Sequence, residues 1–396
     1  MKKKIFKNSL KFVLLLCITV SAQIRNEINI PDIPGYKTLK GDFHIHTVYS
    51  DGRVWPDIRV QEAWHDGLDV IALTDHINYK GPVLQKAVKF EDENLPHRDA
   101  EVIAERLGIT LIKGLEINRY KDPVGHFNIL FLEDINLLKP VQGDLLEAFR
   151  EAKKQGAFIQ LNHPLEGQGK NPHWQEFHKQ AYDEKLLDGL EIFNNKKLHE
   201  EAIPWAIENK LTITSTSDIH YLVNLSHFEV HRPVTLIFAK ENTEKGIKEA
   251  MFERRTAVYF ADTIIGEEKF LKPLFSQSVE LLDPANVVYR KKRYAQLKNH
   301  TDIRFVLEKV REDKVVDLPK KNTLLPNTTN LLEFKVKDSK GIDKREFKVT
   351  YRVMNFKKLT GEPIEVEMVF NKEKQEVKLR KALTPKTMAG GSEEEE

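Results

Sequence analysis

The chain has 396 residues, of which 40% are hydrophobic and 31% are charged, with a formal net charge of +2 and a mean hydropathy of −0.47. These values are typical of a globular protein with one large and one smaller domain, and the near-neutral charge carries no nucleic-acid-binding signature. Cys17 is the single cysteine. Without it the chain has no disulfide, cysteine nucleophile or thiolate zinc site, so any metal must use histidine and carboxylate ligands.

The N-terminal segment has the pattern of a secretory signal. Lysines 2–4 precede the apolar run 12–20, and Val20-Ser21-Ala22 provides small residues before a cleavage point. The apolar run is short for a membrane span. The pattern predicts a signal peptide over residues 1–22, export to the periplasm or the exterior, and no membrane span after its removal. Residues 23–37, marked by Pro31 and Pro34, form a lead-in.

Residues 38–270 alternate between apolar runs that end in polar residues and segments of helical pattern. Continuous apolar runs of this kind are typical of buried parallel strands. The predicted strands cover residues 38–44, 69–76, 109–116, 125–132, 157–164, 189–194 and 211–220, the predicted helices 56–66, 96–107, 144–155 and 198–209, and a last βα unit 234–253. So many βα units favour an α/β barrel, whose active sites lie at the C-terminal ends of the strands.

The pattern changes after residue 270. Segments 331–337, 346–353 and 364–370 alternate between apolar and polar residues, as half-exposed antiparallel strands do. Residues 271–385 are therefore predicted to form a β-sandwich-like domain. Residues 386–396, which end in four glutamates, are predicted to be a disordered tail.

Ionisable residues gather at the predicted strand ends, and six of the fourteen histidines are among them. His44 and His46 project to one face of a strand, because side chains alternate along a strand. A lone strand-end histidine is more often structural, but buried imidazoles and carboxylates packed together are costly unless a cation pairs them. The residues in question are His44, His46, Asp51, His76, Glu116, His126, His163, Asp218 and His220.

These residues stand in motifs that resemble, in order, those of the PHP (polymerase and histidinol phosphatase) family. The motifs are His44–Thr47 with Ser50–Gly52, Thr74–His76, Glu116, His163-Pro164 and Ser217–His220. The resemblance implies a distorted (β/α)7 barrel, TIM-like, with a trinuclear metal centre. A looser likeness over nearly the whole mature chain resembles the Sb-PDE-type phosphodiesterases.

The resemblance also implies a ligand set for each of three divalent ions. His44, His46, Glu116 and Asp218 would hold the first ion, and Glu116 would bridge to a second ion held by His126 and His163. Asp51, His76 and His220 would hold the third. Nitrogen and oxygen ligands suit Zn, Mn or Fe without choosing between them. Glu116, Asp218 and His220 are the residues predicted to act in catalysis.

The predicted function is metal-dependent hydrolysis of a small phosphate ester, most simply a phosphodiester, with a metal-bridging hydroxide as nucleophile. A phosphomonoesterase, a secreted binding module without turnover and an amidohydrolase are the alternatives. Arg119 and Asn195 are candidate substrate contacts, although a surface ion pair explains Arg119 equally well and a turn explains Asn195 better. His173, Trp174 and Tyr221 could wall a leaving-group site, or simply pack. No oligomeric state is predicted.

Overall fold

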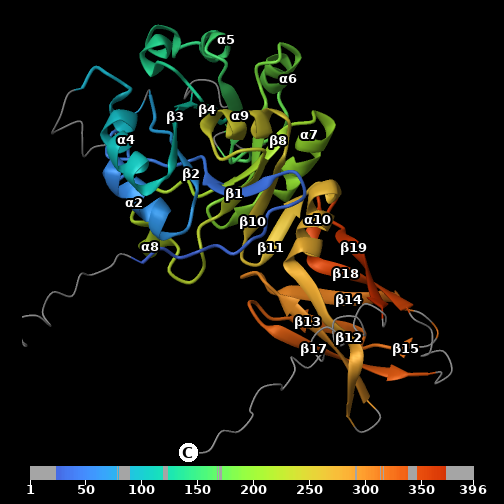
Figure 1. Ribbon diagram of the computed structural model, residues 1–396. Coiled ribbons are helices and arrows are strands. Elements are labelled where there is room, and N and C mark those ends of the chain that lie inside the picture. The colour runs from blue at the N-terminus through green and yellow to red at the C-terminus, as the bar shows by residue number, and fades with distance from the viewer. Residues whose placement is uncertain are drawn as a thin grey trace, which may run out of the picture.

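The computed structural model describes residues 24–77, 79, 90–118, 124–166, 168, 172–289, 292–312, 314, 316–337 and 346–371. The predicted signal peptide and the predicted tail lie outside these residues. The described chain forms an α/β part and a β-rich C-terminal part, which lies below it in Figure 1 and is coloured orange to red. The predicted combination of a distorted barrel with a smaller sandwich is confirmed, as the pairing of strands shows.

Strands of the α/β part pair side by side around a barrel. Parallel pairs join β1 to β2, β2 to β3, β5 to β6 and β6 to β8, and a parallel bridge between Ile45 and Ile219 connects the ends of β1 and β8. The barrel strands are β1 (Lys37–Asp42), β2 (Val70–Leu73), β3 (Thr110–Asn118), β4 (His126–Leu130), β5 (Phe158–Asn162), β6 (Gly189–Asn194) and β8 (Thr212–Thr216).

One barrel strand runs against the others. β4 pairs antiparallel with both β3 and β5, whereas the sequence pattern predicted uniform parallel strands. The reason is the length of the connection, since residues 119–125 are too few for the crossover that a parallel pair requires. His126 therefore begins its strand at the same end of the barrel at which the parallel strands finish.

Helices cover the outside of the barrel (Figure 1). Most begin with a recognisable signal, such as Pro56 in the first turn of α2 or the Asp144 side chain that accepts from the backbone N–H of Leu146 and Glu147 in α5. They are α2 (Pro56–His65), α4 (Leu95–Leu107), α5 (Leu145–Lys154), α6 (Glu176–Asp183), α7 (Ile203–Glu208), α8 (Val223–Ser226) and α9 (Glu244–Phe252), with 3-10 turns η1 (Ile135–Val141) and η2 (Glu200–Ala202).

The predicted helix over residues 198–209 is shorter than expected. Its first part is the strand β7 (Lys197–Leu198) and the turn η2, and the α-helix α7 begins at Ile203, with Pro204 in its first turn. Proline has no N–H to donate to the preceding turn, so a helix starts readily at this point.

A meander of three strands links the barrel to the C-terminal part. β9 (Val234–Ala239) pairs antiparallel with β1, β10 (Thr256–Phe260) pairs with β9, and β11 (Thr263–Gly266) pairs with β10. β11 then pairs in parallel with β18 (Glu346–Lys358) of the C-terminal part, so one sheet runs through both parts. Residue 271, where the sequence pattern changes, lies inside the helix α10 (Glu268–Ser278) at this junction.

The C-terminal part is a sandwich of two antiparallel sheets. One sheet contains β16 (Lys321–Leu324), β14 (Phe305–Glu312), β18 and β19 (Pro363–Asn371), and the other contains β12 (Val279–Tyr289), β13 (Lys292–Asn299), β17 (Thr329–Val336) and β15 (Val316–Asp317). Apolar side chains fill the space between the sheets, as expected where inward and outward residues alternate.

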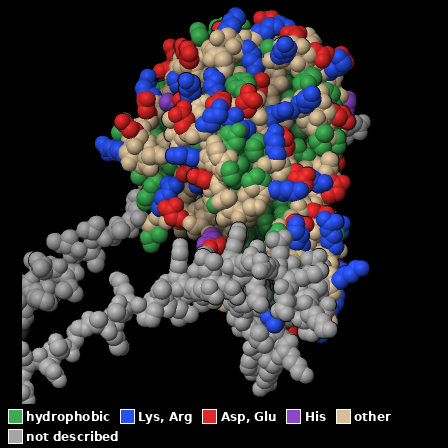
Figure 2. Space-filling model, turned by 45° about the vertical axis from the view of Figure 1, so that its right-hand side comes forward, with side chains coloured by type: hydrophobic (Ala, Val, Ile, Leu, Met, Phe, Trp, Pro, Cys, Tyr) green, Lys and Arg blue, Asp and Glu red, His purple; other side chains and the backbone are tan. Residues whose placement is uncertain are grey.

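Two surface observations complete the fold. No helix among the described residues is long and apolar enough to cross a membrane. On the face shown in Figure 2, basic and acidic side chains are interspersed over the barrel rather than gathered by sign.

Candidate metal centre

All nine strand-end residues predicted as ligands lie together at one end of the barrel. They come from six segments, namely the turn after β1, the ends of β2, β3, β5 and β8, and the start of β4, which reaches the same end because it runs antiparallel to its neighbours. Each of the nine has a ring nitrogen or carboxylate oxygen within 3.7 Å of another member. Their role in binding metal stays a prediction.

The first group converges on a single point. His44 Nε2 and His46 Nε2 are 3.1 Å apart, and they lie 3.4 and 3.2 Å from Glu116 Oε2. The same two nitrogens lie 3.3 and 3.2 Å from Asp218 Oδ1. Ligands about 2.0–2.2 Å from a tetrahedral ion are about 3.3–3.6 Å apart, so the spacing suits one ion in their midst.

The second group uses the other oxygen of Glu116. His126 Nδ1 lies 3.2 Å and His163 Nε2 lies 3.5 Å from Glu116 Oε1, and His163 Nε2 is 4.0 Å from Asp218 Oδ2. Glu116 thus turns one oxygen to each group, as a carboxylate that bridges two ions would. It is 1% exposed, so water cannot balance its charge.

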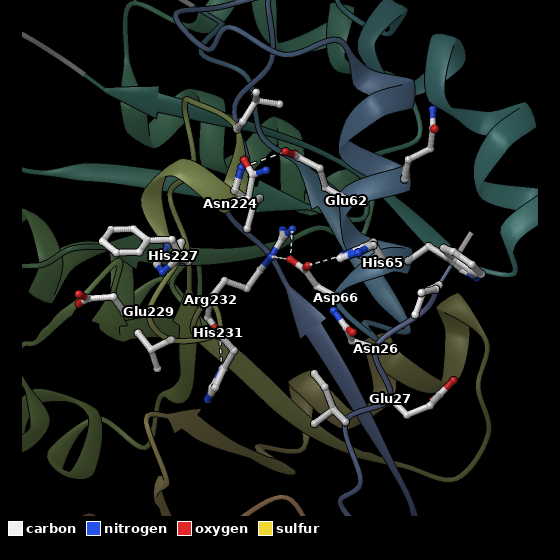
Figure 3. A pocket seen from close by; sticks show the side chains of 18 of the residues that line it. Asn26, Glu27, Glu62, His65, Asp66, Asn224, His227, Glu229, His231 and Arg232 are labelled. Carbon is white, nitrogen blue, oxygen red and sulfur yellow. Dashed lines mark hydrogen bonds and ion pairs between the residues drawn. The ribbon is translucent and has the colours of Figure 1, made fainter. Parts of the chain in front are cut away.

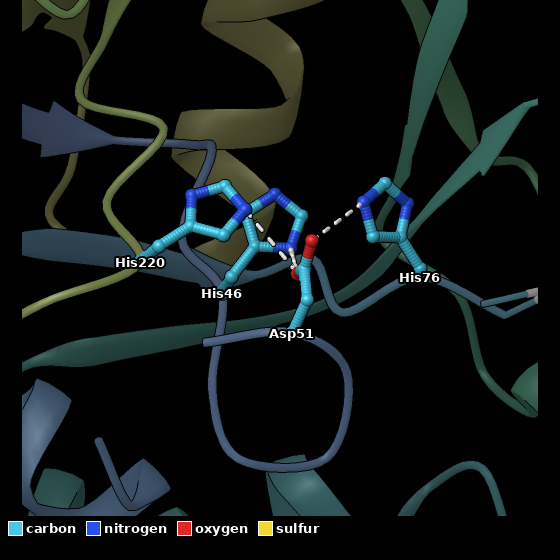
Figure 4. A group of neighbouring side chains, drawn as sticks. All are labelled: His46, Asp51, His76 and His220. Carbon is cyan, nitrogen blue, oxygen red and sulfur yellow. Dashed lines mark ion pairs between the residues drawn. The ribbon is translucent and has the colours of Figure 1, made fainter. Parts of the chain in front are cut away.

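The third group surrounds Asp51 (Figure 4). His220 Nε2 is 3.2 Å from Asp51 Oδ1, and His76 Nε2 is 3.7 Å from Asp51 Oδ2, with the carboxylate between the two rings. His46 lies beside this group, stacked on His220 with ring centroids 4.2 Å apart. His46 and Asp51 therefore bring the first and third groups into contact, with His46 Nδ1 3.5 Å from Asp51 Oδ1.

The protonation of these groups reveals a conflict that a cation would remove. Burial opposes the charged form of His46, but Asp218 and Glu116 outweigh it and raise its pKa to about 10, and they similarly raise that of His163 to about 9. Burial also opposes the charged form of His44. The carboxylates of Asp218, Glu116 and Glu191 outweigh burial there and hold the pKa of His44 well above its usual value. Yet two protonated rings cannot face each other with nitrogens 3.1 Å apart.

The donor set therefore fits divalent cations. The carboxylates of Asp51, Glu116 and Asp218 form no ion pair with a lysine or arginine among the described residues, and their ion-pair partners there are histidines. A divalent ion balances such carboxylates and leaves the imidazoles neutral, which is their metal-binding form. The nitrogen and oxygen donors of this set suit Zn, Mn or Fe without choosing between them, and the identity of the ions stays a prediction.

Glu191 on β6 supports the ligands and was not among the predicted site residues. Its side chain is fully buried, and Oε1 lies 3.0 Å from His44 Nδ1 while Oε2 accepts from the backbone N–H of His163 and from Asn194 Nδ2. A carboxylate at Nδ1 fixes the tautomer that leaves Nε2 free for a metal. The signal in the sequence was an acidic residue inside an apolar strand.

Two more buried aspartates order the loops that carry ligands. Asp75 accepts from Thr47 N, Thr47 Oγ1 and Ser50 Oγ, so it holds the turn between His46 and Asp51. Asp42 accepts from Ser217 N and Ser217 Oγ, immediately before Asp218. Each aspartate ties one ligand-bearing loop to a neighbouring strand.

The backbone is strained or crowded at three of these positions. His163 has φ 23° and Asp218 has φ 50°, in the left-handed region that residues with a Cβ seldom adopt. A Cβ at Gly52 would lie 2.7 Å from the carbonyl of His46. Only glycine therefore lets the turn after Asp51 press against the strand that carries His46.

The residues predicted to contact the substrate or its leaving group lie in different surroundings. Arg119 lies outside the described residues. Asn195 is exposed, with φ 52°, and its N–H donates to Thr216 O, so it makes a turn at the rim and contacts none of the nine residues within the described structure. Trp174 packs on His178 and Trp205, whereas Tyr221 is 53% exposed beside His220.

Three histidines outside the predicted ligand set are buried. His178 joins α6 to Val124 O, and His199 and His227 lie inside loops. His227 lines a hollow of about 920 Å³ between α2, α8 and the lead-in, which Figure 3 shows. Arg232 crosses its floor from Asp66 to Asp42, so the hollow is linked to the ligand loops but contains none of the nine residues.

Two known domain families match the sequence of this chain. The profile of the PHP domain matches residues 42–266, and that of an Ig-like domain matches residues 282–369. The chain is 39% identical to a Bacteroides vulgatus crystal structure, described as a two-domain protein containing a predicted PHP-like metal-dependent phosphoesterase. The match covers 88% of this chain and 100% of that one, with a TM-score of 0.79.

A second relative is a 5'-3' exoribonuclease from Haemophilus influenzae. It is 37% identical over 81 residues, which make up 20% of this chain and 24% of the relative. The chain thus matches about a quarter of that protein's length.

Proposed function

Because the chain belongs to the PHP domain family of metal-dependent phosphoesterases, we propose that it hydrolyses phosphodiesters at a centre of three divalent ions. The observation that carries the proposal is the spacing of the ligand atoms around Glu116. One carboxylate turns an oxygen to each of two sets of histidines, and Asp51 faces a third set.

The exposure of the ligands sets the direction from which a substrate approaches. His44, His46 and Glu116 are at most 1% exposed, whereas the side chains of His126 and His220 are 28% and 29% exposed. A phosphate ester therefore meets the edge formed by Asp51, His126, Asp218 and His220. Divalent ions held here would lower the pKa of bound water and neutralise charge on the phosphoryl oxygens.

The protein's own residues hold this edge in place. Glu191 fixes His44 and the backbone of His163, and His220 Nδ1 lies 2.9 Å from the carbonyl oxygen of Asp218. That contact keeps a proton on His220 Nδ1 and leaves Nε2 free to face Asp51. No side-chain nucleophile is required, which agrees with the lack of cysteine at the site.

The charge at the centre favours a diester over a monoester. A monoester carries close to two negative charges at neutral pH and a diester carries one. Among the described residues, no lysine or arginine forms an ion pair with the carboxylates of Asp51, Glu116 or Asp218, and the buried Arg59 reaches this set at the backbone oxygen of His46, so no basic side chain is placed to meet the additional charge. Phosphomonoester hydrolysis and binding without turnover are the other outcomes of the test.

The test combines metal analysis with two model esters. Protein purified without added metal should contain about three equivalents of Mn, Zn or Fe by mass spectrometry, and Asp51→Ala should contain about two. Loaded protein should cleave bis(p-nitrophenyl) phosphate faster than p-nitrophenyl phosphate. His46→Ala should abolish turnover, whereas His65→Ala, on the exposed surface of α2, should not. Failure to cleave either ester would reject the enzymatic proposal.

A further inference from the structure

Arg53 and Tyr221 form an exposed pair on the two loops that carry the third ligand group. Arg53 follows Asp51 by two residues, and Tyr221 directly follows His220. The Arg53 guanidinium carbon lies 5.3 Å from the centre of the Tyr221 ring. Asp51 and His220 themselves are 3.2 Å apart, so the pair stands at the edge of the metal-binding cluster.

The two loops are locked together beneath this pair. The N–H of Arg53 donates to His220 O at 2.8 Å. The buried Arg59 donates from Nη1 to Tyr221 O, from Nη2 to Ile219 O and from Nε to His46 O, at 2.7, 3.1 and 3.0 Å. The positions of the pair relative to the ligands are therefore fixed by backbone contacts.

The Arg53 side chain has an unused binding capacity. It is exposed, and within the described structure no carboxylate lies within ion-pair distance of it. Stacking on the tyrosine ring holds a guanidinium flat and leaves its N–H groups pointing outward. A planar fork of this kind binds phosphate or carboxylate oxygens two at a time.

We propose that Arg53 and Tyr221 form a subsite that selects substrates with a second anionic group beside the scissile phosphodiester. The inference rests on the proposed diester hydrolysis and names a feature of its substrate. Arg53 is the specificity-determining contact, and Tyr221 is a positioning residue that holds the guanidinium. A stacked arginine with a purely structural role would make no distinction between substrates.

Three p-nitrophenyl esters of thymidine 5'-phosphate test the subsite. They carry a hydroxyl, a phosphate or a hemisuccinate at the 3' position, and release of p-nitrophenol gives kcat/KM for each. The metal-loaded protein should prefer the 3'-phosphate ester to the 3'-hydroxyl ester. A gain with the hemisuccinate as well extends the recognised class to carboxylates, and no gain with either anionic ester overturns the proposal.

Substitution of Arg53 should remove the preference. Hydrogen bonds between charged groups predict that Arg53→Gln loses roughly 10- to 100-fold more kcat/KM on the 3'-phosphate ester than on the 3'-hydroxyl ester. Arg304→Gln, on the exposed surface of the sandwich, is the matched control and should retain the preference. Equal losses on both esters in Arg53→Gln would reduce Arg53 to a structural role and overturn the proposal.

The role of Tyr221 is separated by a pair of variants. Tyr221→Phe keeps the ring and should keep the preference, whereas Tyr221→Ser should reduce it without a matching loss on the 3'-hydroxyl ester. A preference unchanged in Tyr221→Ser would overturn its positioning role. If the wild type cleaves no diester at all, the proposed function fails; if it cleaves all three equally, only the subsite fails.

Discussion

The barrel and the sandwich bury different kinds of residue. The barrel encloses His44, His46, Glu116 and Glu191 in its interior, and each contacts another ionisable group. The interior of the sandwich is apolar, and its buried Asn299 is satisfied by backbone carbonyls, including that of Ile303 four residues away.

The difference shows which part of the chain contains groups whose burial opposes folding. Burying ionisable groups is unfavourable unless they are paired, so the barrel end is expected to depend on bound cations. Apolar packing needs no partner from outside the chain. Substitutions in the barrel end should therefore change activity and metal content, and those in the sandwich should change stability alone.

The largest effect is expected from Asp218→Ala. Its carboxylate faces His44, His46 and His163, so removal should lower kcat/KM about 10⁴-fold, or about 5 kcal/mol at 1.36 kcal/mol per tenfold. Far-UV circular dichroism should change little. Asp183→Ala, on the outer surface of α6, is the control, and comparable turnover in the two variants would contradict the assignment.

Phe305→Ala tests the expectation that substitutions in the sandwich change stability alone. Phe305 is fully buried between Phe275 of α10 and Phe356 of β18, so its truncation should cost about 3–5 kcal/mol of unfolding free energy. Urea unfolding measures the cost, and kcat of the folded, metal-loaded protein should remain unchanged. Leu331→Ala, at a site that is 65% exposed, should cost less than about 0.5 kcal/mol.

Glu191→Gln should have an intermediate effect. The variant keeps the volume of the side chain but replaces the anionic acceptor at His44 Nδ1, so metal affinity should fall about 10- to 100-fold. Competition with a chelator measures the affinity. Glu184→Gln, a partner of Arg150 on the surface, provides the control. Unchanged affinity in Glu191→Gln would show that Glu191 only supports the fold.

The last predicted effect concerns acid stability. Burial lowers the pKa of His178 to about 4 from an unfolded value of about 6.5, although its contact with Val124 O opposes the shift. Its contribution is complete above pH 6.5 and is lost as the pH falls toward 4, because the unfolded chain binds the proton more tightly. Between pH 7.5 and 4.5 the loss should be about 2–3 kcal/mol.

Urea unfolding of metal-free protein at pH 7.5 and 4.5 measures this loss, and His178→Gln should reduce the difference between the two values. The exposed His65→Gln should not reduce it. Equal acid dependence in wild type and His178→Gln would exclude this role for His178.

The parts of the site that lie at strand ends were accessible from the sequence. Parallel strands bring their C-terminal ends to one edge, so His76, His163 and Asp218 could be grouped without knowledge of packing. The position of His126 required the direction of β4, which the pattern of apolar residues does not encode. The connection of seven residues between β3 and β4 indicates that direction, because it is too short for the crossover of a parallel pair.

Other features depend on tertiary contacts that local patterns do not contain. Glu191 is one acidic residue in an apolar strand, and its importance comes from His44, 147 positions away. The change of pattern near residue 271 marked the junction of the two parts, but the helix α10 that spans it was not predicted, because Pro273 argues against a helix interior. The contact between Arg53 and Tyr221 likewise joins distant loops.

The pairing of β11 with β18 has a consequence for any attempt to shorten the protein. A chain cut after residue 278 would leave β11 with a row of unpaired N–H and C=O groups, and such an edge templates association with other strands. The barrel and the sandwich are therefore expected to melt in one cooperative transition. The sandwich is in this sense expected to protect the barrel from edge-to-edge association.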